Sequence, residues 1–530
     1  MPETQNQPGS MVADEKQLPV QKIILGLITP IDDTVVPWLG GVDFVYQHSP
    51  FMEYLVQLDS NTSEWKPMLA KTWEVNATGD VWTFELEQGV QFHRDFGEFT
   101  AADVEHSFQV NCQIGTRASY KGGICNVDHV EILDPHNIRV HTVNPSAEYL
   151  FYAAESAGNM ISSKAQCDAA GGFDVAANQA SEGCTNAYYE SMAGTGPYQY
   201  DGRVEEVHVD YSVAFPDGHW RHDPDYPEMR NTWVLEEATR LAQFRAGETH
   251  MTEVNRDLGD RLVEEGFKII QSTGPAQQTA FRFGGMFYAD PENYDPDFPV
   301  TAPGEIGIKV RKALNKAVDR ETFKQELYKG RVWDSKVHSF HPDLTPWDTK
   351  WDDDWEEEYG FDIEASKQLL IEAGYPEGFE IIVPMYPFPG APELPQIAQF
   401  MQLAWAEIGV TLTLRDEDRA AVVGRRNNKA NHETAVATTP SFKAQEAQMM
   451  LFNTPKSDGG AGLHTTMGAD ERAVILKQMG DIKFYEHEWI PLFWVPIETI
   501  VDPKIICAWP FPGWEGGDLG SNEEIEAPPC

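Results

Sequence analysis

The clearest alternation of hydrophobic and polar positions lies between residues 71 and 86. The hydrophobic side chains of Trp82, Phe84 and Leu86 alternate with polar ones, which predicts a strand with one buried face. A polar sequence typical of a tight turn, at residues 76–80, precedes that strand. The whole segment is therefore predicted to form a β-hairpin.

A second short strand is predicted directly after the hairpin, at residues 90–93. Thr100 and Asp103 then predict the start of a helix, because a threonine side chain caps free backbone amides and an acid is favoured in the first helical turn. Residues 67–108 are thus expected to run strand, turn, strand and capped helix.

The spacing of apolar residues predicts further elements along the chain. The continuous apolar run Ile23–Ile28 predicts a central strand that is buried on both faces. Other strands are predicted at residues 130–133, 138–143 and 410–414. Helices are predicted at residues 149–157, 232–248, 306–318, 363–373 and 394–408, and Asp319 is the predicted N-cap of one more helix.

A chain of 530 residues is longer than one hydrophobic core supports, so two or more lobes are expected. The 41% of hydrophobic residues and the 15 tryptophans are enough for large cores. Residues 1–18 are polar and are predicted to form a disordered leader. They have neither the basic nor the apolar region of a signal peptide, which fits a mature exported protein and a cytoplasmic protein equally.

The charge balance narrows the range of partners. The chain has 40 basic and 84 acidic residues and a formal net charge of -44, which argues against nucleic acid or an anionic membrane surface as a partner. It predicts a solvated acidic shell, which suits a secreted or salt-exposed protein. No apolar run approaches the roughly 18 to 20 residues that a membrane span needs.

The six cysteines contain no Cys-x-x-Cys spacing, which argues against a zinc site. Fifteen pairings are open, and we predict the sequential one because it closes short loops. A disulfide that closes a loop of about 13 residues contributes about 3 kcal/mol in the chain-entropy model. The predicted pairs, which imply an oxidising compartment, are Cys112 with Cys125, Cys167 with Cys184 and Cys507 with Cys530. The alternative is six reduced, partly buried thiols.

Sequence templates of the common enzymes are absent: there is no Walker A loop, no dinucleotide-binding glycine motif, no His-Glu-x-x-His and no Gly-x-Ser-x-Gly. The acidic residues of segment 352–358 offer oxygen ligands for Ca²⁺ but lack EF-hand spacing, so an exposed acidic loop is expected there. His338 and His341 are the closest candidates for nickel ligands, and we expect both to be ordinary loop residues.

Four separated motifs resemble those of the family 5 extracellular solute-binding proteins, which are the peptide, nickel and oligosaccharide receptors of ABC importers. The first is the signature PMLAKTWEV, WTFEL, GVQFH and FTAADV within residues 67–108. The others are GTGPY at 194–198, VRKALNKAVDRETFKQELYKGR at 310–331 and FDIEASKQLLIEAGYPEGFEI at 361–381. The resemblance covers about residues 20 to 500.

The resemblance implies a two-lobed α/β fold, like that of periplasmic binding proteins, with an extra subdomain inserted in the first lobe. The second lobe is expected at residues 275–485, so that the chain crosses between the lobes near 275 and 485. The late strand at residues 489–494 is expected to cross back to the first lobe. The first lobe is expected at residues 19–47, 194–274 and 486–530, and the inserted subdomain at 48–193.

The resemblance also implies a function. The protein is expected to be a monomeric periplasmic or extracellular receptor, without enzymatic activity or cofactor, that captures an oligopeptide or a similar small solute and delivers it to an ABC permease. A receptor for an oligosaccharide or another non-peptide solute is the alternative within the same fold. A secreted acidic hydrolase is the alternative of another class, because the chain is rich in carboxylates and a pair of them is enough for glycoside hydrolysis.

Peptide receptors of this family place an aspartate after a tryptophan-rich strand, where it pairs with the amino terminus of the ligand. The matching stretch here has Thr438, Thr439, Ser441 and Lys443 and no aspartate, which favours a neutral or anionic ligand group. Loops that follow strands are expected to line the cleft, although any one of these residues also fits an ordinary packing role. The predicted ligand-binding residues are Trp38, Phe287, Tyr288, Tyr386, Phe388, Thr439, Ser441 and Lys443.

Overall fold

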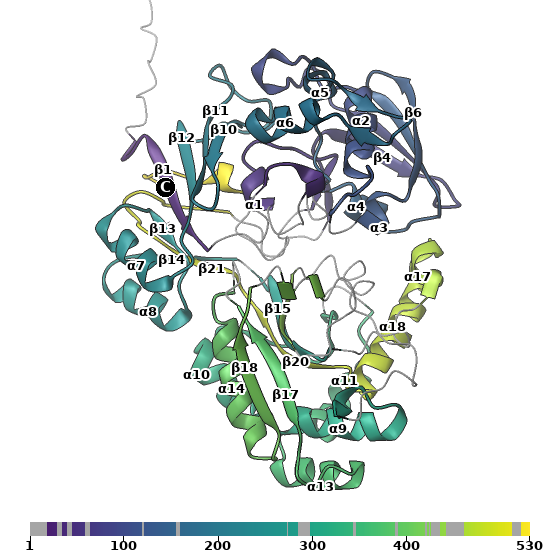
Figure 1. Ribbon diagram of the computed structural model, residues 1–530, viewed down its shortest axis with the longest axis vertical. Coiled ribbons are helices and arrows are strands. Elements are labelled where there is room, and N and C mark those ends of the chain that lie inside the picture. The colour runs from purple at the N-terminus through teal and green to yellow at the C-terminus, as the bar shows by residue number, and fades with distance from the viewer. Residues whose placement is uncertain are drawn as a thin grey trace, which may run out of the picture.

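The computed structural model describes residues 18–28, 34–39, 45–58, 64–118, 121–154, 159–272, 274–284, 297–342, 346–386, 391–418, 421–422, 424–425, 435–440, 460–510 and 521–530. They form two halves, which lie one above the other in Figure 1. We call the described residues before 273 and after 497 the first half, and residues 277–495 the second half.

A seven-stranded sheet organises the first half. Its strands are β1 (Lys22–Leu27), β10 (Tyr198–Val204), β11 (His208–Val213), β12 (Glu228–Trp233), β13 (Met251–Thr252), β14 (Lys268–Gln271) and β21 (Glu498–Val501). Their order is β10-β11-β12-β1-β13-β21-β14, and β1 runs parallel to β12 and β13. This confirms the predicted central strand, which spans residues 22–27.

The predicted helix at residues 232–248 begins later than expected. Trp233 is the last residue of β12, because its backbone pairs with that of Leu27 in β1. The helix α7 (Glu237–Ala246) starts only after Glu236, whose side chain accepts hydrogen bonds from the first helical amides. Long-range strand pairing therefore overrides the helical spacing of Trp233.

A second, four-stranded sheet in the first half has the order β4-β5-β7-β6 and its own hydrophobic core. Its strands are β4 (Ala70–Val75), β5 (Val81–Leu86), β6 (Val127–Asp134) and β7 (Asn137–Thr142). The antiparallel pairing of β4 with β5 confirms the predicted hairpin. The helix α2 (Ala101–Asn111) follows, and Thr100 and Asp103 form its capping box as expected.

The predicted strand at residues 90–93 is wrong. Gln91 forms only an isolated bridge, and the chain then turns through a short 3-10 helix at His93. The buried ring of His93 donates from Nε2 to the carbonyl of Gly196 (2.8 Å) and accepts at Nδ1 from the amide of Gly194 (3.2 Å). These two bonds to a distant segment replace the strand pairing.

The remaining elements of the first half are short, apart from the helices α6 (Glu182–Ser191) and α8 (Arg256–Glu264), which pack on the large sheet. The short elements are η1 (Pro37–Leu39), α1 (Val45–His48), β2 (Val56–Leu58), β3 (Trp65–Pro67), α3 (Lys121–Ile124), α4 (Tyr149–Tyr152), α5 (Lys164–Ala169), β8 (Phe173–Asp174), β9 (Gln179–Ala180) and η7 (Asn522–Glu524).

All three predicted disulfides are present, and all three lie in the first half. Cys112 just after α2 is bonded to Cys125 just after α3, and Cys167 in α5 is bonded to Cys184 in α6. Cys507 is bonded to Cys530. Each bond joins neighbouring segments, so the sequential pairing is confirmed.

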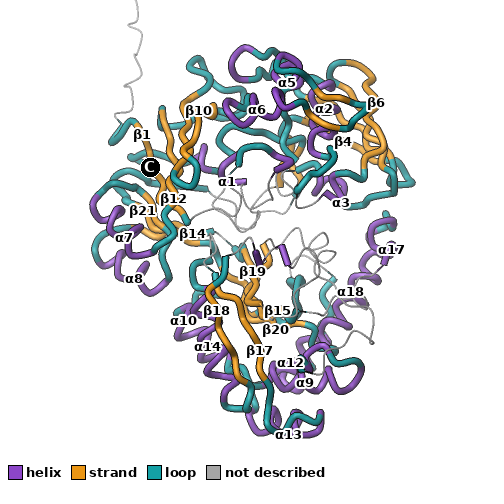
Figure 2. Tube along the Cα trace, viewed as in Figure 1, coloured by secondary structure: helices purple, strands orange, loops and turns teal. Residues whose placement is uncertain are grey.

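Two sheets organise the second half. One sheet has the order β16-β20-β15-β19 and contains β15 (Gln277–Arg282), β16 (Trp333–Asp334), β19 (Ala435–Pro440) and β20 (Trp489–Val495). The other pairs β17 (Glu380–Met385) and β18 (Thr411–Asp416) in parallel. The helices are η6 (Pro299–Thr301), α9 (Gly304–Lys316), α10 (Arg320–Tyr328), α11 (Lys350–Asp353), α12 (Trp355–Tyr359), α13 (Ile363–Ala373), α14 (Leu394–Ala406), α17 (Gly460–Thr465) and α18 (Ala469–Tyr485). Figure 2 shows α10 and α14 on one side of β17 and β18 and α9 and α12 on the other.

The strand expected to return to the first half does not do so. Trp489 and Trp494 lie in β20, which pairs with β15 and stays in the second half because residues such as Ile490 pack into its core. The return is made by β21, so the chain crosses at residues 496–497 and not near 485. The other crossing runs from β14 to β15, near the expected residue 275.

The Gly-Thr-Gly-Pro-Tyr segment has a packing role. A Cβ atom on Gly194 would lie 1.8 Å from the carbonyl oxygen of Phe51, and one on Gly196 would lie 2.7 Å from the carbonyl carbon of Phe51. The amide of Gly196 donates to that same oxygen (3.1 Å). Glycine is therefore required where the two backbones meet, just before β10.

We expect Gly194→Ala to lower the free energy of unfolding by about 3 kcal/mol, because the added methyl group meets backbone that cannot move aside. Gly122→Ala is the matched control, since a Cβ there meets no atom within 4 Å and the residue lies in α3. The control should be neutral or slightly stabilising. Equal urea midpoints for the two variants would contradict this assignment.

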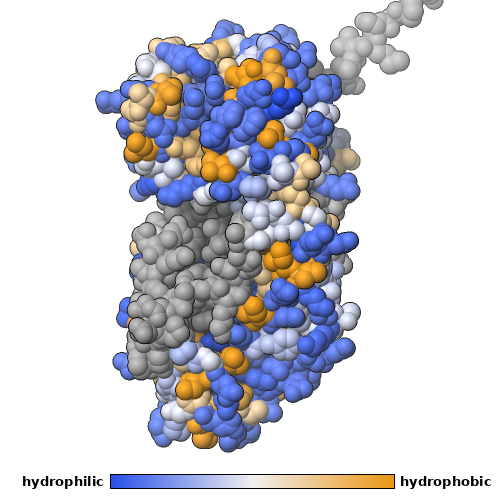
Figure 3. Space-filling model, turned by 90° about the vertical axis from the view of Figure 1, so that its right-hand side faces the viewer, coloured by the Kyte–Doolittle hydropathy of each residue, from blue (hydrophilic) through white to orange (hydrophobic). Residues whose placement is uncertain are grey.

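The chain carries about twice as many acidic as basic residues. The chain has 84 acidic and 40 basic residues, so at least 84 - 40 = 44 carboxylates have no basic residue to pair with one to one. Figure 3 shows a largely hydrophilic surface over both halves on the face it presents. Mutual repulsion among these carboxylates opposes folding.

We expect KCl to raise the melting temperature by about 5 °C between 0.05 and 1 M, because salt screens this repulsion. Most of the rise should occur in that range, in which the Debye length falls to about 3 Å. A melting temperature that stays constant, or that climbs only above 1 M KCl, would show that repulsion is not what limits stability.

Candidate ligand-binding site

Each half turns one described surface towards the other half. The first is the edge of the large sheet where the parallel strands β12, β1 and β13 end, the edge at which α/β proteins commonly bind ligands. Figure 1 shows β1 running towards the middle of the molecule. The side chain of Glu253, which is 1% exposed, accepts a hydrogen bond from the amide of Ile28 (3.0 Å). It thereby fixes the end of β1.

The second surface is one face of the β15 and β20 pair. Phe281 points to the helix-covered face, where its ring lies 5.3 Å from that of Trp405 in α14. Gln278 and Arg282 alternate with it and therefore point to the opposite face. Their cross-strand neighbours are Trp494 and Trp489. In Figure 1 the first half lies above β15 and β20, and α9 and α13 lie below these strands.

Two histidines extend this aromatic face. The ring of His338 stacks on Trp489 with 3.4 Å between ring centroids, and the ring of His341 meets Trp494 edge-on at 5.6 Å. Gln278 holds the loop that carries them, because its side chain donates to the carbonyl of Val337 (3.2 Å) and accepts from the amide of Ser339 (2.8 Å). Both histidines are loop residues as predicted, but they are buried.

Two cations lie near His338. The guanidinium of Arg282 lies 5.9 Å from the ring centroid of Trp489. Lys483, in α18, is 3% exposed, and none of the described residues accepts a hydrogen bond from its Nζ. Burial, together with the charges of Lys483 and Arg282, holds the pKa of His338 well below its ordinary value. The imidazole is therefore neutral while both cations stand close to it.

Contacts between the halves lie at both ends of the site. Beside the crossings, Arg256 of α8 pairs with Glu498 (2.7 Å) and with Glu393 of the second half (3.3 Å). At the other end, Arg472 of α18 pairs with Glu148 of the first half (2.6 Å), and both side chains are buried. The pairs of Arg256 with Glu393 and of Arg472 with Glu148 are satisfied only while the halves stay together.

Two of the predicted ligand-binding residues have described side chains. Trp38 packs in the core of the first half, where its ring lies 5.8 Å from that of Tyr188 and 4% of the residue is exposed. The structure favours a packing role for it. Tyr386 directly follows β17 and is half-buried against the hydrophobic core of the second half.

The other predicted ligand-binding residues are described less fully or not at all. Thr439 lies in β19, where it pairs with Gln278, so the backbone places this position beside the aromatic face. The remaining five lie outside the described residues: Phe287, Tyr288, Phe388, Ser441 and Lys443.

The acidic segment 352–358 is not a loop as predicted, although Asp352, Asp353, Glu356 and Glu357 are exposed as expected. These residues form α11 and α12, because the aromatic side chains of Trp351 and Tyr359 are buried beneath them. Glu358 pairs with Lys312 (2.7 Å) and with His487 (3.0 Å). The hydrogen bond from His487 is the largest cause that lowers the pKa of Glu358 to about 2.

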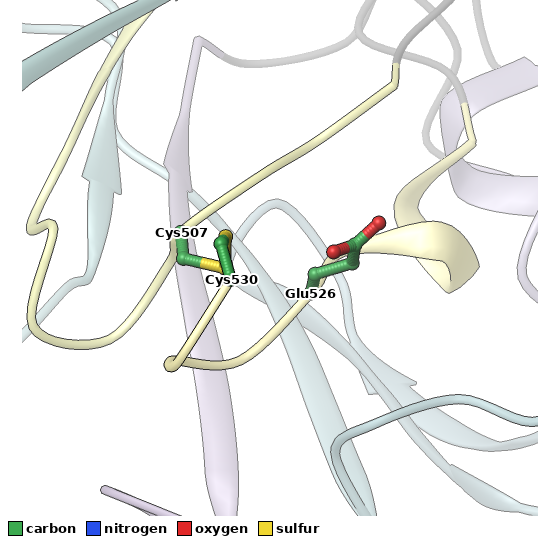
Figure 4. A group of neighbouring side chains, drawn as sticks. All are labelled: Cys507, Glu526 and Cys530. Atoms are coloured by element: carbon green, nitrogen blue, oxygen red, sulfur yellow. A yellow bond between two sulfur atoms is a disulfide. The ribbon is translucent and has the colours of Figure 1, made fainter.

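Metal-ligating side chains come close together at one place in the described chain. The sulfur atoms of Cys507 and Cys530 and a carboxylate oxygen of Glu526 lie within 4.8 Å of one another. Figure 4 shows that the two sulfurs are bonded to each other. A disulfide offers no thiolate to a metal, so this group is a cross-link with a neighbouring acid.

Sequence reasoning missed Arg282, Trp489, Trp494 and Lys483. The strand β20 is apolar throughout, so its two tryptophans resemble core residues and show no alternation. The sequence pattern could have indicated Lys483, because this residue lies at helical spacing from the buried residues Arg472, Leu476 and Met479. A lysine within a buried helical stripe is rare without a partner.

Solved structures of binding proteins share this fold. NikA from Brucella suis in complex with Fe(III)-EDTA superposes with a TM-score of 0.76 and 17% identity, covering 96% of this chain and 99% of that one. A dipeptide binding protein from Pseudoalteromonas sp. SM9913 in complex with Met-Leu gives a TM-score of 0.75 and 18% identity, covering 94% and 100%. The predicted two-lobed α/β fold is confirmed.

Curated relatives are similar over most of the chain. Heme-binding protein A of Haemophilus influenzae is 25% identical over 484 residues, which cover 83% of this chain and 80% of the relative. The dipeptide-binding protein of Escherichia coli K12 is 26% identical over 391 residues, which cover 70% and 67%. The profile of the bacterial extracellular solute-binding proteins, family 5 Middle, matches residues 64–459. This chain therefore belongs to the family 5 extracellular solute-binding proteins.

Proposed function

We propose that this protein is the solute receptor of an ABC importer, which holds a short peptide or a similar small solute between its halves and delivers it to a membrane permease. The observation that carries the proposal is the pair of opposed surfaces, one at the carboxyl ends of parallel strands and one aromatic and basic, with ion pairs between the halves at both ends. The names of the dipeptide-binding relatives support a peptide.

Capture would work by closure. A solute that contacts both surfaces favours the arrangement in which the halves lie close, and only this difference in affinity between open and closed forms drives the movement. The pair between Arg472 and Glu148 adds to the closed state, because its partners belong to different halves.

The basic residues guide the choice of solute. Arg282 and Lys483 favour a solute with a negative group over a neutral oligosaccharide, because a buried cation gains most from an opposite charge. The two tryptophans and the neutral His338 suit the apolar parts of the same solute.

We further infer a monomer that works outside the cytoplasm without catalysis. The family name describes extracellular proteins, and the relatives named above are binding proteins. Every helix in the described part of the chain is too short or too polar to cross a membrane. The net charge of -44 argues against nucleic acid as a partner.

Calorimetry with a panel of di- to pentapeptides and oligosaccharides tests the proposal, combined with small-angle scattering on the same mixtures. We expect a peptide to bind and to reduce the radius of gyration while mass spectrometry recovers it intact. Hydrolysed peptide would contradict the receptor, and binding of oligosaccharides alone would contradict the solute class.

Glu148→Gln should weaken the binding of such a peptide about tenfold, mainly through faster dissociation, because the variant loses a charge pair made across the closed halves. Stopped-flow fluorescence measures both rates. Glu265→Gln is the control, since it breaks the pair of Glu265 with Arg245 within the first half. The same dissociation rate in both variants would show that the pair with Arg472 does not stabilise the closed form.

A further inference from the structure

Lys483 has a position that folding alone does not explain. It lies on the buried stripe of α18 with Leu476 and Met479, where an apolar side chain would fit the pattern. An ammonium group that is withdrawn from water without a hydrogen-bond acceptor destabilises a folded protein. The described residues supply no acceptor for its Nζ.

The backbone brings Lys483 next to the aromatic face of the site. Its carbonyl accepts a hydrogen bond from the amide of Glu488 (3.3 Å), so the end of α18 turns directly into Trp489, the first residue of β20. Figure 1 shows α18 leading into this strand. Trp489 in turn contacts Arg282 and His338.

The charges around Lys483 favour an anion. The carboxylate of Glu488 is the acid that acts on it, and burial still outweighs that attraction and lowers the pKa of Lys483 to about 8. Arg282, beside Trp489, is a second cation that acts on His338, and His338 itself adds no charge because its ring is neutral. A negative group arriving with the solute would supply the acceptor that Nζ lacks.

We propose that Lys483 and Arg282 form an anion-binding subsite in the second half, which receives a carboxylate of the bound solute. The proposal rests on the receptor function proposed above and names the chemical group that the receptor selects. A phosphate presents the same charge to the two cations, so the experiment separates the two groups.

The first test compares peptides that differ only at this group. Met-Leu and other di- and tripeptides with a free carboxyl terminus are titrated beside their carboxamides into wild type and Lys483→Met. Wild type should prefer the acids at least tenfold, and Lys483→Met should bind acids and amides alike. Lys477→Met is the matched control, because Lys477 is an exposed residue of the same helix that pairs with Asp348 (2.9 Å), and it should keep the preference.

Two outcomes overturn the subsite while the receptor function stands: wild type binds peptide acids and amides equally, or Lys483→Met keeps the preference. If wild type binds no peptide, the proposed solute class fails. The subsite is then tested with simple anions. Acetate or phosphate should raise the melting temperature above that in chloride of equal ionic strength, in wild type but not in Lys483→Met. The absence of this difference overturns the subsite, and a response to phosphate alone assigns it to phosphate groups.

Stability in the absence of solute gives a readout that does not depend on binding. At pH 7 Lys483→Met should melt a few degrees above wild type, because it removes a buried charge that costs stability. The pKa of Lys483, about 8, is below the ordinary lysine value of 10.5, so the unfolded chain binds more protons between these values and wild type regains stability as the pH rises from 8. The difference in melting temperature between Lys483→Met and wild type should therefore become smaller above pH 8.

For Lys477→Met, the difference in melting temperature from wild type should not become smaller above pH 8. A Lys483→Met protein that is less stable than wild type at pH 7 would show that the lysine holds the fold together, and would overturn the subsite. Lys483→Gln, which keeps a polar group at the same place, replaces Lys483→Met if that variant does not fold.

Discussion

The structure depends on the backbone pairing of its two crossing segments. The amide of Ser272 donates to the carbonyl of Ile497 (2.9 Å), and the amide of Ala276 donates to the carbonyl of Val495 (2.9 Å). The hydroxyl of Ser272 also accepts from the amide of Ile497 (3.2 Å). Side by side, the segments resist sliding and twisting more than one strand would. Bending across the pair remains the easiest relative motion of the two halves.

Buried charged side chains lie between the two halves, where a bending motion would change their surroundings. Arg256 meets two carboxylates and also donates to the carbonyl of Pro496 (3.0 Å), so it ties the crossing itself to both halves. Arg472 likewise has a carboxylate opposite it. Lys483 differs from both, because its ammonium has no acceptor among the described residues. Arg256 and Arg472 have the chemistry of structural ion pairs, whereas Lys483 has that of a ligand-binding group.

Local patterns predicted much of the fold. The alternation of β5, the capping aspartate at residue 319 and the helix Ile363–Ala373 with glycine after it each depend on residues close in sequence, and all three are found as predicted. The cysteine pairs are local too. The family motifs supplied the two-lobed arrangement, which no local pattern indicates.

Errors arose where distant segments decide the outcome. Trp233 fits a helix by spacing but pairs with β1, and residues 90–93 lose a strand to the hydrogen bonds of His93. The sheet membership of β20 depends on its partner strand, which a uniformly apolar sequence does not reveal. For the same reason the aromatic face was missed, since one face of a strand has meaning only once its neighbours are known.

The place of β21 in the first sheet bears on how the protein is made. The second half is one continuous stretch of chain, whereas β21 lies inside the first sheet, between β13 and β14. In the described part of the chain β14 pairs with β21 alone. Until residues 498–501 leave the ribosome, β14 therefore has no neighbour and the first sheet ends at β13. Synthesis of the second half therefore precedes completion of the first sheet, so a partly made chain has no complete pair of lobes with which to hold a solute.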